Sequence, residues 1–232
     1  MNNINMKIHP YIENLIEFEV PKTWSDVTNI LKNSIDKRYI DNAGNILNNS
    51  IDRRYNIDSV GNVTIDNEIF ENDEHIFIVN NGKLIGTNNG EWGGQLIFKN
   101  NEIEYSIIDD NICGITNFKN NIYVLTGLSH MGGNDGNIIK INYINKKWII
   151  ENIINLETCP RIFSIFENLM YIITSDGLVL FDGIKINKKL SNQFWESLYP
   201  ETMFINTEII AIGLRGCVAI IDKNTYNIKC YK

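Results

Sequence analysis

The sequence predicts an all-β fold, a β-propeller of five blades with an irregular N-terminal extension that contains one short helix. Three observations predict it. A four-strand pattern recurs about every forty residues from residue 71 onward, turn residues separate its strands, and 232 residues suffice for one large core. A β-sandwich is the competing fold, but its strands follow one another at intervals of about 8–12 residues, without a forty-residue repeat.

The repeat is clearest in the second strand of each unit, which follows a polar turn and ends at a small residue. Its marker positions lie 38, 48 and 39 residues apart and are Leu84, Ile122, Met170 and Ile209. Third strands follow Gly-containing turns at 95–98, 137–141, 178–181 and 218–221. First strands are predicted at 76–79, 112–118, 161–166 and 203–206, and fourth strands at 102–108, 147–154, 185–190 and 226–231. The predicted blades are 71–110, 111–157, 158–199 and 200–232, within a single domain.

Residues 1–70 carry a short duplication of their own. The segment 34–46 recurs as 50–63, and each copy contains turn chemistry, Asn-Ala-Gly-Asn or Ser-Val-Gly-Asn, that predicts a β-hairpin. Apolar residues at helical spacing follow the possible N-caps Thr23 and Ser25 and predict one amphipathic helix: Val27, Ile30, Leu31, Ile35 and Tyr39. We expect this region to close the ring as a fifth blade against the last one.

Composition and charge exclude several classes of protein. The chain is 44% hydrophobic and 21% charged with a net charge of −7, which is typical of a soluble globular protein and unlike a disordered one. Glu13, Glu17 and Glu19 interrupt any signal-like apolar stretch, and no run approaches the ~18 residues of a membrane span, so we expect a cytoplasmic protein. The acidic balance argues against nucleic acid as partner. We expect a monomer when free, with no membrane partner.

Known catalytic and metal-binding motifs do not occur. Cys113, Cys159, Cys217 and Cys230 lie far apart without CxxC spacing, so neither a structural disulfide nor a zinc site is predicted. No nucleophile elbow, Walker loop, HExxH or Rossmann glycine pattern appears. We therefore assign no catalytic residue, metal or cofactor.

The turns after the second strands are the least ordinary segments of the chain, at 88–94, 127–136, 175–177 and 214–217. If the repeat forms a propeller, they lie on one face, where binding function concentrates. The predicted partner-binding residues are Glu91, Trp92, His130, Asp135, Asp176 and Arg215.

Two of these residues have alternative roles, evenly weighted for Trp92 and weighted toward the ordinary role for His130. Trp92 is either a contact aromatic for a protein or sugar, or a residue that folds back over its blade. His130 is either a general base paired with Asp135 or an ordinary histidine of a Gly-rich loop.

The charged residues also have ordinary interpretations. Glu91, Asp135 and Asp176 either bind a cation or form Asx turns. Arg215 either recognises a carboxylate or pairs with Glu91 or Asp176.

Two further residues are expected to be structural. Cys217 begins an apolar strand, which favours a small buried side chain. Trp195 precedes the last blade, and we expect it to belong to a connector that packs aromatic side chains between sheets.

From about residue 55 to the C-terminus, the chain resembles a loosely characterised group of small bacterial propeller-like proteins. The resemblance depends on four segments in order: GEWGG at 90–94, LTGL at 125–128, W-x-x-LYP at 195–200 and G-x-R at 213–215. The group implies a propeller fold and no established catalytic residues. The first fifty residues depart from its pattern.

The function that these observations favour is a non-enzymatic, protein-binding propeller. An immunity protein or inhibitor that neutralises a basic bacterial toxin fits the acidic charge, because carboxylates steer a basic partner electrostatically. One alternative is a hydrolase, lyase or cyclase using Glu91, His130 and Asp135. Another is a carbohydrate-binding module using Trp92 and Asn88.

Overall fold

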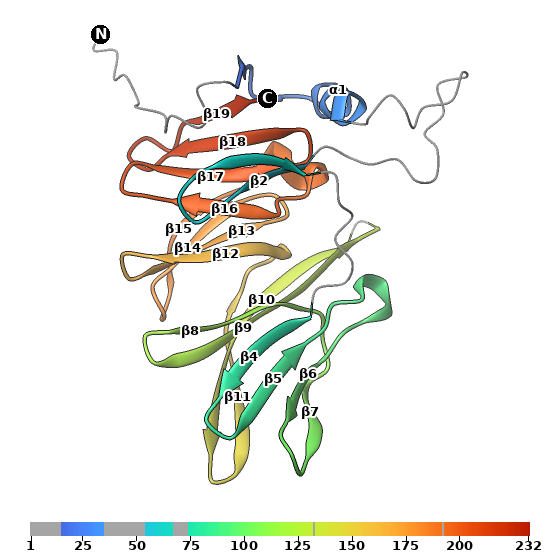
Figure 1. Cartoon of the computed structure of the whole chain (residues 1–232), viewed down its shortest axis with the longest axis vertical. Coiled ribbons are helices and arrows are strands. Elements are labelled where there is room, and N and C mark those ends of the chain that lie inside the picture. The colour runs from blue at the N-terminus through green and yellow to red at the C-terminus, as the bar shows by residue number, and fades with distance from the viewer. Residues whose placement is uncertain (1–14, 35–53, 67–73, 132, 192) are drawn as a thin grey trace. The chain divides into compact units, whose positions relative to one another are not determined.

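The chain forms a predominantly β protein, which confirms the all-β class (Figure 1). The computed structural model describes residues 15–34, 54–66, 74–131, 133–191 and 193–232. The chain divides into two compact units, one formed by parts of 1–69 together with 194–232 and the other by 70–193.

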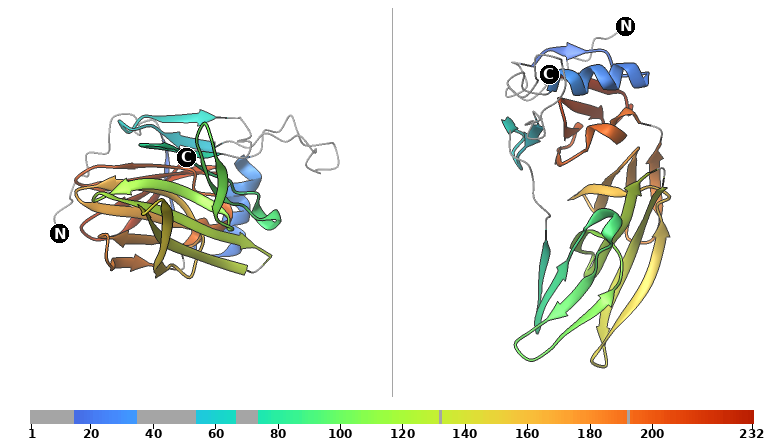
Figure 2. Two further views of the ribbon diagram at one scale, coloured as in Figure 1. Left: turned by 90° about the horizontal axis from the view of Figure 1, so that it is seen from below. Right: turned by 90° about the vertical axis from the view of Figure 1, so that its right-hand side faces the viewer.

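Residues 70–193 contain three four-stranded antiparallel sheets, each a meander of consecutive strands, which Figure 2 shows from two further directions. The first sheet consists of β4 (His75–Val79), β5 (Gly82–Gly86), β6 (Leu96–Lys99) and β7 (Glu104–Ile108). The second consists of β8 (Ile112–Phe118), β9 (Asn121–His130), β10 (Gly133–Ile144) and β11 (Lys147–Asn155). The third consists of β12 (Pro160–Phe166), β13 (Leu169–Thr174), β14 (Leu178–Phe181) and β15 (Ile186–Leu190).

The sheet β8–β11 is covered by apolar side chains on both of its faces. In β9, Val124 packs with Leu84 and Phe98 of the first sheet, whereas its neighbour Leu125 packs with Met170 and residues of the third. Alternate side chains of a strand point to opposite faces, so a strand buried on both sides needs a continuous apolar run. This explains the unbroken run at 122–125.

The other unit contains the last meander and the N-terminal elements. Its sheet consists of β16 (Thr202–Ile205), β17 (Ile209–Leu214), β18 (Cys217–Asp222) and β19 (Ile228–Tyr231), extended by β1 (Glu17–Phe18) beyond β19. A hairpin of β2 (Arg54–Ile57) and β3 (Val63–Asp66) packs on this sheet, where Tyr55 and Ile57 contact the cluster around Ala211, Val218 and Ile220.

The second copy of the N-terminal duplication is this β2–β3 hairpin. The carboxylate of Asp58 accepts the backbone N–H groups of Val60 and Asn62 at 2.9 and 2.8 Å, and Gly61 has a positive φ of 92°. The turn is therefore an Asx-stabilised one in which glycine is favoured. The first copy, at 34–46, lies outside the described residues apart from Ser34.

The predicted helix is α1 (Trp24–Ser34), and it begins with a reciprocal cap. Thr23 Oγ1 accepts the N–H of Asp26 at 3.2 Å, while Asp26 Oδ2 accepts the N–H of Thr23 at 2.9 Å. The N–H of Lys22, followed by the Thr23 groups, lowers the pKa of Asp26. The expected continuation through Ile35 and Tyr39 lies outside the described residues.

Asn and Asp residues form the turns between third and fourth strands in three of the four meanders. Each accepts two backbone N–H groups of its own turn: Asn100, Asp182 and Asp222. These are Asx turns, which an asparagine or an aspartate can form. The N–H of Lys185 lowers the pKa of Asp182 and that of Thr225 lowers the pKa of Asp222.

Polar contacts hold β1 against β19. Glu17 Oε2 accepts the Tyr231 hydroxyl at 3.2 Å and Lys229 Nζ at 3.1 Å. Burial and then the Glu17 carboxylate raise the pKa of Tyr231 to about 12.

This raised pKa makes the stability dependent on alkaline pH. Above the pKa of an unfolded tyrosine, about 10, the unfolded chain releases a phenolic proton that the folded chain retains, so the contribution is complete below about pH 10 and is lost as pH rises toward 12. Between about pH 10 and 11.5, we expect the free energy of unfolding of Tyr231→Phe to fall less steeply with pH than that of the wild type. Urea unfolding at several pH values measures it. Tyr105→Phe, at an exposed position, serves as the control, and an equal flattening there would contradict the assignment.

Candidate functional site

A polar groove of about 410 Å³ lies in the unit formed by residues 70–193. It is lined by the turn after β5, the segment before β8 and the hairpin of β9 and β10: residues 90–94, Asp109, Asp110, Asn111, Leu128 and Asp135. Four of the lining side chains are carboxylates, those of Glu91, Asp109, Asp110 and Asp135. The groove is therefore a concave acidic surface.

Asn111 shapes one wall of this groove. Its side chain is almost completely buried, with the residue 3% exposed. Its Nδ2 donates to the Gly90 carbonyl at 2.7 Å, and its Oδ1 accepts the N–H of Asn89 at 3.1 Å. These contacts fix the 3-10 helix Gly90–Trp92, where Gly90 and Gly93 have φ values of 60° and 80° that favour glycine.

Trp92 lies at the end of this turn and is 85% exposed. Of the two roles considered for Trp92, folding back over the sheet is therefore not the one adopted. A large aromatic side chain in water on an anchored backbone is a typical contact residue of protein interfaces.

Glu91 and His130 contact each other across the groove's edge. Glu91 Oε2 lies 2.8 Å from His130 Nε2, and both side chains are about half exposed. The contact joins the turn after β5 to the end of β9, two segments about forty residues apart in sequence.

The segment 127–136, predicted as a Gly-rich loop, is part of a long hairpin. β9 extends to His130 and β10 begins at Gly133, and the pairs run from Gly133–His130 through Gly136–Gly127. Gly127 and Gly136 serve close packing, because a Cβ on either would meet the ring of Pro160 and one on Gly136 would also meet the Thr158 carbonyl. These glycines are therefore needed because a neighbouring chain segment approaches closely, and not because the chain turns there.

Asp135 faces Leu128 across this hairpin. Its Oδ1 accepts the N–H of Leu128 at 3.1 Å, and both residues line the groove. Its carboxylate therefore belongs to the acidic lining.

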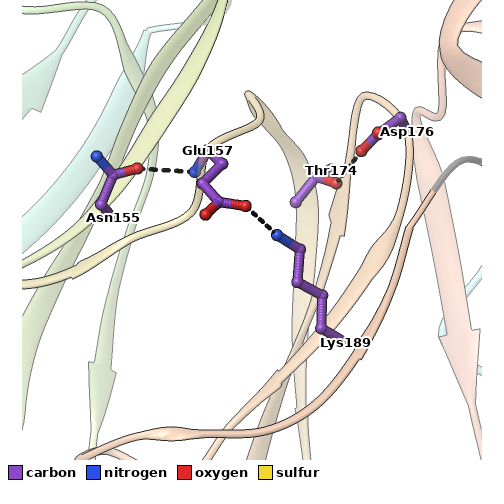
Figure 3. A network of polar contacts seen from close by, with 5 residues as sticks. All are labelled: Asn155, Glu157, Thr174, Asp176 and Lys189. Atoms are coloured by element: carbon purple, nitrogen blue, oxygen red, sulfur yellow. Dashed lines mark hydrogen bonds and ion pairs between the residues drawn. The ribbon is translucent and has the colours of Figure 1, made fainter.

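Asp176 belongs to a separate set of polar contacts (Figure 3). The hydroxyl of Thr174 donates to Asp176 Oδ1 at 3.5 Å, and the Asp176 carbonyl accepts the N–H of Gln193 at 2.6 Å. Nearby in the same view, Lys189 Nζ donates to Glu157 Oε2 at 2.5 Å and lowers the pKa of Glu157. Asp176 does not belong to the groove lining described above.

Arg215 belongs to the other unit, between β17 and β18. Its backbone N–H donates to the Leu198 carbonyl at 2.7 Å. The structure therefore brings Glu91, Trp92, His130 and Asp135 together around one groove, and Asp176 and Arg215 do not line that groove.

The hydrogen bonds of two asparagines, the buried Asn111 and the partly buried Asn134, were missed by the sequence analysis. Asn111 holds the Trp92 turn, and Asn134 Oδ1 accepts both the N–H of Cys159 at 2.7 Å and the hydroxyl of Ser175 at 2.9 Å. Asparagine is so frequent in this chain that no single one stands out. The one sequence feature that could have indicated a role for Asn111 is its position directly before the first strand of a meander, β8.

We expect Asn111→Ala to loosen the Trp92 turn. The substitution removes both side-chain hydrogen bonds and leaves the Gly90 carbonyl without this donor, which typically costs about 1–3 kcal/mol. Hydrogen exchange measured by mass spectrometry should become faster across 89–93. Asn101→Ala, at an exposed position, is the control, and unchanged exchange in Asn111→Ala would contradict this role.

The described residues offer few features of a metal or membrane site. Among them, no group of three or more His, Cys, Asp or Glu side chains is placed to hold a metal ion. Within the same residues, no helix is long and apolar enough to cross a membrane.

Comparisons with known proteins show no family for this chain. No family model matches it, and no curated protein matches it. Among solved structures, the extracellular domain of the putative hybrid two-component system BT4673 from B. thetaiotaomicron aligns at 17% identity over 77% of this chain, with a TM-score of 0.42.

Two further structures align at lower scores. An S. cerevisiae structure of Dbp5 with Nup159, Gle1, IP6 and ADP aligns at 7% identity over 81% of this chain (TM-score 0.31), and the computationally designed Ika8 protein at 7% over 74% (TM-score 0.30). This chain spans 25%, 66% and 62% of the three matched chains.

Proposed function

We propose that this chain is a protein-binding β-propeller whose acidic groove docks a basic partner protein. The observation that carries the proposal is the exposed Trp92 held beside a groove lined by Asp109, Asp110 and Asp135. An aromatic anchor next to complementary charge is the usual composition of an interface centre.

The five-bladed arrangement is part of this proposal. Four meanders of four strands lie within the predicted blade ranges, and β2–β3 packs its apolar face on the last meander as a partial fifth blade would. An experimental structure in which these sheets do not surround a common axis would contradict this part.

The charges favour a partner rich in lysine and arginine. The chain has a net charge of −7, to which the carboxylates of the groove contribute. A basic surface would therefore be attracted over long range, and the association rate would fall as ionic strength rises. An immunity protein that inhibits a basic toxin is the form of this function that we propose.

The test is capture of the partner by the immobilised chain from an extract of the organism that carries the gene. We expect a basic protein to be retained at low salt and released as salt rises. The double variant Asp109→Asn/Asp110→Asn keeps the size and shape of both side chains, removes two charges and should retain much less. Glu102→Gln/Glu208→Gln removes two exposed charges elsewhere and should retain as much as the wild type.

Two results would contradict the proposal. If both double variants retain the partner equally, the groove is not part of the interface. If no protein is retained at all, the chain does not have the proposed binding function. The immunity form requires in addition that the captured protein be a toxin inhibited by an equimolar amount of this chain.

The contact between Glu91 and His130 favours a second candidate, the hydrolase-type enzyme. A carboxylate that holds a histidine ring can orient it as a general base. A panel of chromogenic esters and glycosides tests it. Turnover that disappears in His130→Gln would support the enzyme, and no turnover by the wild type would contradict it.

A further inference from the structure

Cys113 and Cys159 lie side by side in the core of the unit formed by residues 70–193, although 46 residues separate them in sequence. Cys113 belongs to β8, and Cys159 directly precedes β12 of the next sheet. Both side chains belong to one buried cluster, both thiols are free, and the residues are 8% and 2% exposed.

A β-bulge places Cys113 at this position. Ile112 pairs with Thr126 and Gly114 pairs with Leu125, so Cys113 is the extra residue between two regular pairs. A bulge redirects a side chain that regular pairing would orient otherwise. Gly114 also lets the third sheet approach, because a Cβ there would meet the ring of Phe163.

The two thiols lie among polar groups of the segments that shape the groove. Asn88 Nδ2 donates to Cys113 Sγ at 3.6 Å, and that sulfur lies 3.5 Å from the Gly127 carbonyl oxygen. The N–H of Cys159 donates to Asn134 Oδ1 at 2.7 Å. The hydrogen bond from Cys113, with a smaller contribution from the Arg161 guanidinium, lowers the pKa of Cys159.

The other two cysteines have a different environment. Cys217 and Cys230 lie in β18 and β19 and are completely buried. Burial raises the pKa of both thiols, that of Cys230 to about 12. The contact with Cys159 and then burial raise the pKa of Cys113 as well, so Cys159 is the one of the four cysteines whose pKa is lowered. Since the thiolate is the reactive form, Cys159 is the expected nucleophile.

We propose that Cys113 and Cys159 are a redox-active pair that hydrogen peroxide converts into an intramolecular disulfide joining the second and third sheets. The Cys159 thiolate attacks one peroxide oxygen, the O–O bond breaks, and the leaving hydroxide takes a proton to become water. The sulfur of Cys113 then attacks the resulting sulfenic acid, the S–O bond breaks and a second water leaves with the Cys113 proton. Two thiols and one peroxide thus give one disulfide and two waters.

A small oxidant suits the site, because Cys159, which attacks it, is 2% exposed and its neighbour Cys113 is 8% exposed. The bond would tie β8 to the segment before β12 and close a long loop of the unfolded chain. Such a cross-link restricts the unfolded state, so the oxidised protein should unfold at a higher urea concentration.

The test is peroxide treatment of the native chain, followed by blocking of free thiols with N-ethylmaleimide in denaturant and peptide mapping by mass spectrometry. We expect one Cys113–Cys159 linked peptide that dithiothreitol removes, with Cys217 and Cys230 carrying the label. The same treatment of the unfolded chain is the control. There the shorter loop favours Cys217–Cys230, so the preferred pair should change.

Variants keep the result interpretable. Cys113→Ser and Cys159→Ser should each abolish the increase in urea midpoint on oxidation, whereas Cys217→Ser should retain it. Full labelling of Cys113 and Cys159 after peroxide treatment, or a native Cys217–Cys230 link at equal yield, would overturn the proposal. Because the wild-type map needs no substitution, a variant that fails to fold does not affect the test.

Discussion

Trp195→Ala is expected to lower the free energy of unfolding by about 3–5 kcal/mol, which is the largest stability effect that we predict. Trp195 is fully buried in the 3-10 helix Phe194–Leu198, against which α1 packs. Its ring meets that of Phe194 edge-on with the centroids 5.6 Å apart. Removing an indole from this position leaves a cavity that the surrounding residues close only in part. Urea unfolding followed by circular dichroism measures the loss.

Trp24→Ala is the matched control, because Trp24 lies in α1 of the same unit and is 68% exposed. That substitution should change the free energy by less than about 0.5 kcal/mol. Trp195→Phe should fall between the two. A loss below about 1 kcal/mol in Trp195→Ala would show that the indole contributes little packing.

The strands were predictable from sequence because each is an apolar run between turn residues. For the first and fourth strands of the four meanders, predicted and observed ends differ by at most two residues, as for β8 (Ile112–Phe118) and β15 (Ile186–Leu190). The turn residues make this possible, since Asn and Asp side chains end a strand by binding the backbone of their own turn. Cys217 was also correctly expected to be buried, and Trp195, for which a packing role was expected, is fully buried as well.

The long hairpin of β9 and β10 was not predictable from local sequence. Four of the ten residues in 127–136 are glycines, at 127, 132, 133 and 136, and glycine clusters usually indicate turns. For Gly127 and Gly136 the reason is instead the segment around Thr158 and Pro160, which packs against the hairpin. Such contacts connect residues distant in sequence and leave no local pattern.

The groove was predicted in part for a related reason. Glu91, Trp92, His130 and Asp135 were expected on one face because equivalent turns of a repeat lie together, and these four come from adjacent sheets. Asp109 and Asp110 were not expected there, because they lie between sheets and not in the selected turns. Asn111 was missed because its role depends on a buried contact with Gly90.

Trp92→Ala is expected to weaken binding of the captured partner by about 30- to 1000-fold. Truncation of a tryptophan at an interface centre typically costs about 2–4 kcal/mol of binding free energy, which corresponds to that range. Trp92 qualifies because its backbone is fixed by Asn111 and its side chain is 85% exposed, so little order has to be gained on binding. Calorimetric titration of the purified partner measures the affinity.

Trp92→Ala should weaken binding without lowering the stability of the chain. An exposed side chain contributes little to folding, so Trp92→Ala should leave the urea midpoint almost unchanged. Trp24→Ala removes an exposed tryptophan outside the groove and should bind as the wild type does, while Trp92→Phe should retain part of the affinity. If Trp92→Ala binds within about twofold of the wild type, the interface lies elsewhere, since loss of a central aromatic anchor is rarely that small.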